Sequence, residues 1–386
     1  MHRKALSALT VLFFMMGFIT CLNDILVPYL KQVFDLTYTQ ASLIQFSFFM
    51  AYALASIPAS KLIEKIGYQK GMVTGFIMAA LGCLLFYPAV SFHVYELFLI
   101  ALFVLAIGVV ILQVAGNPYV SVLGPAETSS SRLTMTQAFN SLGTFLAPIF
   151  GSILILSRLH ESGTSEAVKY PYLFIACVLI VIAIVLSKLS LPQITFNPDN
   201  SGTWSNALKK KGLWLGMIGI FTYVGAEVAI GTFFVNFIRE TTGILEAEAA
   251  QLVALYWGGA MIGRFIGIFT LNKFSPGKVL FAHAMFAIGF ILIALTNDGM
   301  MAVYSLMLVG LCNSIMFPTI FTLALKGHEE MAEKASGLMS TAILGGAIVP
   351  LITAYVADKS GLRVGFIIPA ACYLYIAFFG LLKRKN

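Results

Sequence analysis

The sequence has 386 residues, of which 59% are hydrophobic and only 11% are charged. Soluble domains usually carry about 25% charged residues, so this composition excludes a soluble globular protein and indicates an integral membrane protein. The net charge of +7 does not define a nucleic-acid-binding face, because the basic residues fall in short loops between long apolar runs. We expect no nucleic acid among the partners.

Twelve apolar segments are each long enough to cross about 30 Å of hydrocarbon as a helix. The first follows a basic start and resembles a signal peptide, but no clean cleavage site of small residues follows it, so we interpret it as the first span. The sequence therefore predicts an all-α membrane protein with spans at 5–30, 38–62, 71–90, 95–123, 132–157, 170–190, 212–238, 248–271, 277–296, 300–325, 335–357 and 362–382.

The basic residues are distributed unevenly between the two sides of this topology. With the N-terminus inside, most of the 24 Lys and Arg residues collect on one side, including those at 209–211 and 383–385. The positive-inside rule then predicts that both termini are cytoplasmic. We expect a multi-pass protein of a bacterial-type inner (plasma) membrane.

Residues 192–211, "PQITFNPDNSGTWSNALKKK", are polar and rich in turn-forming residues. They predict a cytoplasmic linker between an N-terminal bundle, 1–191, and a C-terminal bundle, 212–386. Two motifs recur about 200 residues apart: "QVAGNP" with "NSIMFP", and "GTFLAP" with "GGAIVP". Such a duplication is typical of transporters that bind their substrate near the bilayer midplane between the two halves.

Asp24 is one of two carboxylates that lie well inside the predicted spans, and it shares a helical face with Thr20 and Pro28. Pro28 has no N–H, so the Asp24 carbonyl loses its normal helical partner. A carboxylate beside a free carbonyl suits a small cation, and Asn23, Thr20 and Asn117 supply further oxygens. We predict a Na⁺ site at Asp24. The alternative is a structural carboxylate paired with a base on another helix.

Glu227 is the second deep carboxylate and lies at the middle of the seventh predicted span, in "YVGAEVAIG". Arg264 lies within the next span. Glu227 therefore either faces the substrate or forms a salt bridge with Arg264. Because Arg264 lies toward the cytoplasmic third of its span, we assign it a gating or structural role.

Amide side chains occur at several mid-span positions. A buried amide without a partner is costly in hydrocarbon, so these amides are expected to face one another or a watery cavity. A polar cavity with an aromatic wall suits a sugar, since amides bind its hydroxyls and a ring covers its apolar face. We therefore predict a sugar site formed by Gln137, Asn140, Asn313, Trp257, Glu227, Gln113, Tyr52 and Gln45.

Other chemistries find no support in the sequence. The five cysteines are scattered through apolar stretches without metal-ligand spacing, which predicts small buried apolar residues. No nucleophile–base pair, zinc motif or phosphate-binding loop is present. We therefore expect neither an enzyme nor a protein with a bound cofactor, and no charged ring that would line a channel.

Five stretches carry a resemblance that covers nearly the whole chain. The chain resembles the fucose and glucose/galactose symporters, a branch of the major facilitator superfamily. The resemblance implies twelve helices in two six-helix bundles, alternating access, and uptake of a monosaccharide coupled to a cation. The matching stretches are "NDILVPYLKQVFDLTYTQASLIQFSFFMAYALASIPA" (23–59), "GNPYVSVLG" (116–124), "RLTMTQAFNSLG" (132–143), "YVGAE" (223–227) and "NSIMFPTIFTLAL" (313–325).

The resemblance also identifies departures from the fucose/proton branch. The motif aspartate of that branch matches Asp24 and its glutamine matches Gln137, but its span-four glutamate is replaced by Gln113. Cys21 stands where the family has asparagine, and Glu227 where the fucose branch has glutamine. These departures resemble the glucose/galactose branch. We therefore expect a monomeric hexose symporter in which Na⁺ is the coupling ion.

Two alternatives remain open from the sequence. Proton coupling of sugar transport, as in the fucose branch, is the first. A drug or metabolite exporter of the same superfamily is the second, although the number of mid-span amides argues against the mostly aromatic cavity that such an exporter would need.

Overall fold

The computed structural model describes the chain except for residues 1, 35–37, 152–167, 195–203, 245 and 385–386. Every regular element in the described part is a helix, which confirms the predicted all-α class. Eleven helical segments of that part are long and apolar enough to cross a membrane. The predicted fifth span, 132–157, is not among them, and its helix is described only as far as Gly151.

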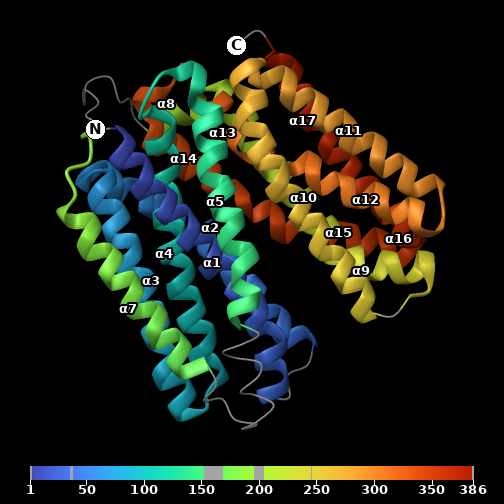
Figure 1. Cartoon of the computed structure of the whole chain (residues 1–386), viewed down its shortest axis with the longest axis horizontal. Helices are drawn as coiled ribbons and strands as arrows, with labels where there is room; N and C mark the ends of the chain where they lie inside the picture. Colours follow the sequence, from blue (N-terminus) through green and yellow to red (C-terminus); the bar gives the residue numbers. More distant parts are fainter. Residues whose placement is uncertain (1, 35–37, 152–167, 195–203, 245, 385–386) are drawn as a thin grey trace. The chain divides into compact units, whose positions relative to one another are not determined.

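Contacts group the chain into two compact units. Unit 1 comprises Met1–Leu123, Phe139–Ser201 and Glu330–Thr341. Within it, α3 packs along both α4 and α7, and the three helices lie side by side in Figure 1. Its helices are α1 (His2–Val33), α2 (Tyr38–Ile66), α3 (Tyr68–Phe92), α4 (Tyr95–Val122), the second half of α5 (Ser129–Gly151), α7 (Lys169–Lys188) and α14 (Ala332–Thr341).

Unit 2 comprises Gly124–Ala138, Gly202–Glu329 and Ala342–Asn386. Within it, α11 packs along α17 and α12 (Figure 1). Its α-helices are α8 (Trp204–Lys209), α9 (Lys211–Thr242), α10 (Glu246–Lys273), α11 (Pro276–Thr296), α12 (Gly299–Asn313), α13 (Met316–Leu325), α15 (Gly345–Ser360), α16 (Leu362–Gly365) and α17 (Ile367–Leu382). Unit 2 also contains the start of α5 and three short 3-10 turns: η1 (Ala126–Thr128), η4 (Glu329–Met331, at the junction with unit 1) and η5 (Ala342–Leu344).

The two compact units follow the order of the sequence except for two segments. Residues 124–138 group with unit 2, and residues 330–341 group with unit 1. An ion pair between Lys334 and Glu64, together with a hydrogen bond from Ser60 Oγ to the Glu333 carbonyl (2.7 Å), holds α14 on α2. The division into bundles 1–191 and 212–386 stays a prediction, and the predicted linker contains the short helix α8.

Glycine allows the helices of each unit to approach backbone to backbone. A Cβ on Gly82 of α3 would lie 2.4 Å from the Leu105 nitrogen of α4, and Gly108 of α4 meets α3 in the same way. In unit 2, a Cβ on Gly310 of α12 would lie 2.1 Å from the Tyr256 carbonyl oxygen of α10. Small residues at such crossings are the usual means of packing helices in lipid, where no hydrophobic effect drives association.

Three predicted spans contain interruptions that the sequence patterns did not reveal. α13 begins just after Ser314, and Pro318 in its first turn cannot donate to the Ser314 carbonyl. Pro369 stands in the same relation to Gly365 at the start of α17. Each proline therefore lies in the first turn of the second helix, which begins within three residues of the end of the first. The interrupted spans are those predicted at 300–325, 335–357 and 362–382.

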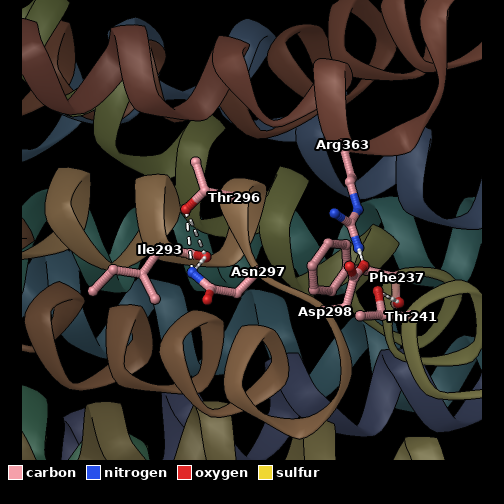
Figure 2. A network of polar contacts seen from close by, with 7 residues as sticks. All are labelled: Phe237, Thr241, Ile293, Thr296, Asn297, Asp298 and Arg363. Atoms are coloured by element: carbon pink, nitrogen blue, oxygen red, sulfur yellow. Dashed lines mark hydrogen bonds and ion pairs between the residues drawn. The ribbon is translucent and has the colours of Figure 1, made fainter.

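Figure 2 shows how polar groups close one end of unit 2. Arg363 at the start of α16 forms an ion pair with Asp298, the residue that directly precedes α12. Asn297 Nδ2 donates to the Ile293 carbonyl at 2.9 Å, and Thr241 Oγ1 donates to a carbonyl of its own helix. These contacts satisfy helix ends at the surface, where an exposed ion pair contributes little to stability.

Candidate functional site

In unit 1, a tyrosine and an amide from two packed helices meet inside the bundle. Tyr52 of α2 donates its hydroxyl proton to Gln113 Oε1 of α4 at 2.8 Å. The two side chains are only 4% and 8% exposed. Among the described residues, no group hydrogen-bonds Gln113 Nε2, so this amide keeps a donor for another ligand.

In unit 2, five side chains from four helices form a continuous hydrogen-bonded network. Tyr373 Oη of α17 donates to Asn313 Oδ1 of α12 (2.6 Å), and Asn313 Nδ2 donates to Tyr256 Oη of α10 (2.8 Å). Tyr256 then donates to the Glu227 carbonyl of α9 (3.2 Å), while Tyr223 donates to Glu227 Oε1 (2.8 Å). We call these residues the Glu227 network. It fixes both the backbone and the carboxylate of Glu227.

Trp257 follows Tyr256 on α10 and therefore lies about 100° further round the helix. Its side chain is 40% exposed, and its ring meets the Tyr256 ring edge-on with centroids 5.2 Å apart. The indole also lies against Gly231 of α9, where a Cβ would be 2.8 Å from a ring carbon. The predicted aromatic wall thus adjoins the Glu227 network, but Tyr256 is the ring that enters it.

Arg264 of α10 binds backbone carbonyls. Its Nε donates to the Ser314 carbonyl at 3.2 Å, the group that Pro318 leaves without a helical donor, and its Nη1 donates to the Gln137 carbonyl at 3.4 Å. Arg264 acts electrostatically on Glu227, but the two do not form the salt bridge that the sequence left open. The gating or structural role of Arg264 stays a prediction.

Two predicted sugar ligands on α5 have different surroundings. Gln137 is buried in unit 2, and its carbonyl accepts from Arg264. Asn140 Nδ2 donates to the Phe13 carbonyl of α1 at 3.0 Å, where Gly17 permits close contact between the two helices. The Asn140 amide nitrogen is therefore engaged in helix packing in unit 1.

The predicted cation site is described only in part. Thr20 is half-buried on α1, and Asn117 is completely buried on α4, where its carbonyl accepts from Ser121 Oγ at 2.8 Å. The side chains of Asn23 and Asp24, like that of Gln45, lie outside the described residues. The Na⁺ site at Asp24 therefore stays a prediction.

Tyr223, Tyr256 and Tyr373 are not among the functional residues predicted from the sequence. Tyr223 precedes Glu227 by four residues, which places both on one helical face, so this pair was recognisable from spacing. Tyr256 and Tyr373 reach Asn313 from helices 57 and 60 residues away in the chain, and no local pattern encodes such partners.

The described residues contain no group of three His, Cys, Asp or Glu side chains able to hold a metal ion. All five cysteines are free thiols. Cys83 and Cys312 are buried as expected, but Cys177 is exposed on α7. Because α7 has the length and hydropathy of a membrane span, an exposed apolar thiol there is suited to contact with lipid.

The fold and the buried polar networks define a helical membrane transporter. The family model of the Major Facilitator Superfamily matches residues 8–343, and the chain belongs to this superfamily. Its relatives are transporters and not enzymes. The resemblance noted in the sequence is thereby confirmed.

Individual relatives cover nearly the whole chain. The glucose/galactose transporter of Brucella abortus is 51% identical, over 99% of this chain and 94% of its own. The L-fucose-proton symporter of Escherichia coli is 33% identical, over 98% of this chain and 93% of its own. A crystal structure of the transporter FucP in the outward conformation matches with a TM-score of 0.92 at 30% identity, covering 100% of both chains.

Proposed function

We propose that this protein takes up a hexose of the glucose/galactose type by cation symport, through alternating access, with Na⁺ as the coupling ion. The sugar is supported by the similarity to the Brucella abortus glucose/galactose transporter. The observation that carries the coupling argument is the Tyr52–Gln113 pair. Gln113 occupies the position of the span-four acid of the fucose branch, and an amide cannot exchange a proton near neutral pH.

The coupling ion is assigned to Asp24, with Thr20, Asn23 and Asn117 as additional oxygen ligands. Carboxylate, hydroxyl and carbonyl oxygens are the ligands that hard cations prefer. A bound Na⁺ would neutralise the carboxylate, and binding of sugar only to the ion-loaded protein would couple the two fluxes. Proton coupling remains the alternative because a 33% identical relative is named a proton symporter. It would use Asp24 or Glu227, the two deep acids.

The hydrogen-bond partners refine the proposed sugar site. Gln113 keeps a free donor, Trp257 keeps an exposed ring face, and Glu227 presents a carboxylate positioned by Tyr223. Asn140 and Asn313 each already donate one amide N–H to a protein acceptor, and Asn313 is fully buried. We therefore assign sugar contact chiefly to Gln113, Gln137, Glu227 and Trp257, with Tyr52 and Gln45 supporting them, and packing roles to Asn140 and Asn313.

The proposed topology places both termini on the cytoplasmic side of a bacterial inner membrane, with the protein acting as a monomer. The distribution of Lys and Arg supports this orientation. This orientation can be measured with a single cysteine introduced after Lys211, whose accessibility is probed from either side of the membrane.

Uptake of labelled glucose and galactose by proteoliposomes tests the function. We expect a Na⁺ gradient to drive accumulation at fixed pH, and Asp24→Asn to abolish that dependence. If a pH gradient drives accumulation and Na⁺ has no effect on it, the coupling ion is the proton and not Na⁺. Full Na⁺ dependence in Asp24→Asn would move the ion site to Glu227.

The substrate site is tested by binding. Gln137→Ala should weaken hexose binding while the protein stays folded, whereas Asn272→Ala, an exposed amide on α10, should bind as the parent does. Equal affinity in the two variants would remove Gln137 from the site.

A further inference from the structure

Two basic side chains of unit 2 converge on the start of α9, at one end of its helices. Lys383 follows α17, His328 lies in the turn after α13, and Gly212 is in the first turn of α9. A Cβ placed on Gly212 would lie 3.5 Å from His328 Nε2 and 3.7 Å from Lys383 Nζ. The two side chains therefore point at the same place, beside the start of α9.

Lys326 adds a second ammonium group to this place. Burial and the positive charge of Lys326 together lower the pKa of Lys383. Among the described residues, no carboxylate acts on Lys383, and the Glu329 carboxylate accepts from the Gly327 N–H at 3.0 Å. The two ammonium groups repel one another, and a bound anion would relieve the repulsion.

The positive-inside rule alone does not explain this arrangement. That rule requires basic residues on one side of the membrane, but it does not require them to converge. Here the end of α17 is fixed on α11, since Ser275 Oγ donates to the Arg384 carbonyl at 3.0 Å and Gly277 lies against the Lys383 carbonyl. The position of Lys383 is thus set by packing and is maintained despite its like-charged neighbour.

The surroundings of the cluster favour a lipid headgroup over a soluble anion as its ligand. α9, α13 and α17 are parts of candidate membrane spans that begin or end at this point. Large apolar side chains beside it remain exposed, including Trp214 (46%) on α9 and Leu382 (52%) on α17. Tryptophan is enriched at the level of the headgroups, and basic clusters at helix ends bind anionic lipids.

We propose that Lys326, His328 and Lys383, at the start of α9, form a binding site for the phosphate of an anionic glycerophospholipid whose acyl chains lie along the adjoining apolar surface. The positive end of the α9 helix dipole favours an anion at the same place. The site shares no residue with the Glu227 network or with the proposed ion site, and it carries no part of the sugar chemistry.

The test uses the purified full-length protein in neutral detergent, titrated with phosphatidylglycerol or phosphatidylcholine while thermal unfolding is recorded. Phosphatidylglycerol should raise the Tm and phosphatidylcholine should not, because a ligand that binds the folded state stabilises it. Changing Lys326→Gln and Lys383→Gln together should weaken the apparent affinity about 25-fold, at about fivefold per lysine. Lys383→Arg, which keeps the charge, should retain binding.

The control carries Lys65→Gln and Lys188→Gln, which remove the same charge from two exposed lysines of unit 1. It should respond to phosphatidylglycerol as the parent does. Equal weakening in the control and the cluster variant would show general electrostatic attraction and overturn the proposal. So would an identical response to the two lipids in the parent, or reproduction of the whole Tm shift by inorganic phosphate or glycerol 3-phosphate.

Discussion

Both compact units join a tyrosine to the amide that opens the repeated motif, but the two pairs leave different groups free. In unit 1, Tyr52 donates to Gln113, and Gln113 Nε2 has no partner among the described residues. In unit 2, Asn313 donates to Tyr256 and accepts from Tyr373, and its side chain is 0% exposed. Similar sequence motifs therefore have different hydrogen-bond surroundings in the two units.

The difference follows from the number of partners that each amide has. A ligand can bind Gln113 without breaking any protein hydrogen bond, whereas it would have to displace a tyrosine to bind Asn313. An unsatisfied buried hydroxyl costs about 1–3 kcal/mol, which a single new hydrogen bond to a solute does not repay. We infer that the unit 1 pair binds substrate and that the unit 2 pair positions Glu227.

The largest expected effect is on stability, at Asn313. Asn313→Leu leaves the Tyr256 and Tyr373 hydroxyls without their amide partners inside the bundle. We expect the free energy of unfolding to fall by about 3 kcal/mol, measured by denaturant or thermal unfolding in detergent. Adding Tyr373→Phe should restore part of the lost free energy of unfolding. A variant with parental stability and lost hexose binding would instead make Asn313 a sugar ligand and remove the contrast between the units.

The second effect is on affinity, at Gln113. Gln113→Ala should weaken hexose binding about tenfold, the equivalent of one lost hydrogen bond, while the free energy of unfolding falls by only about 1 kcal/mol. Isothermal titration with the purified protein measures the affinity. Adding Tyr52→Phe removes the orphaned hydroxyl and should recover stability but not affinity. Recovery of affinity in the double variant would show that Gln113 acts only on the fold.

A smaller effect is expected at Tyr223, the hydroxyl that fixes the Glu227 carboxylate. Tyr223→Phe should reduce hexose affinity about threefold, because the carboxylate keeps its place in the helix but gains rotameric freedom. Tyr375→Phe is the matched control, since its hydroxyl donates to the Leu215 carbonyl away from the network. Equal changes in both variants would mean that loss of any buried tyrosine hydroxyl perturbs the unit.

The smallest effect is expected at the surface ion pair of Figure 2. Asp298 is largely exposed, so Asp298→Asn should change the free energy of unfolding by less than about 0.5 kcal/mol and leave hexose affinity unchanged. Thermal unfolding and titration on the same sample would measure both. A loss comparable to that of Asn313→Leu would show that this end of unit 2 controls the stability of the whole unit.

Hydrophobic run lengths predicted the helical class and the approximate spans because an apolar run of about twenty residues has few alternatives to a membrane helix. Asp24 and Glu227 stood out for a related reason, since a charge in such a run needs an explanation. The interruption at Ser314 was foreseeable from Pro318 in principle, but a proline inside a membrane helix kinks it in some cases and breaks it in others.

The partners within the candidate site were less predictable. Asn313 was expected to bind sugar, but whether an amide faces a cavity or two tyrosines depends on helices distant in sequence. Trp257 and Tyr256 are adjacent and about 100° apart round α10, so the rotation of this helix about its axis decides which ring enters the network. Span prediction does not determine that rotation. The helix packing does, through close contacts such as that of Gly310 with α10.

The hydrogen bond from Arg264 to the Ser314 carbonyl has a consequence for biogenesis. An arginine within a nascent span raises the cost of its release into lipid, by up to about 3 kcal/mol at the span centre, and a carbonyl without a donor is also poorly tolerated there. Arg264 supplies the donor that the Ser314 carbonyl needs, and this carbonyl supplies an acceptor for Arg264, but Arg264 is synthesised first. We expect the ribosome-bound chain to keep the Arg264 segment beside the insertion machinery until the Ser314 segment emerges, so that both enter the bilayer together. Insertion assays on nascent chains that end before or after Pro318 would detect this delay.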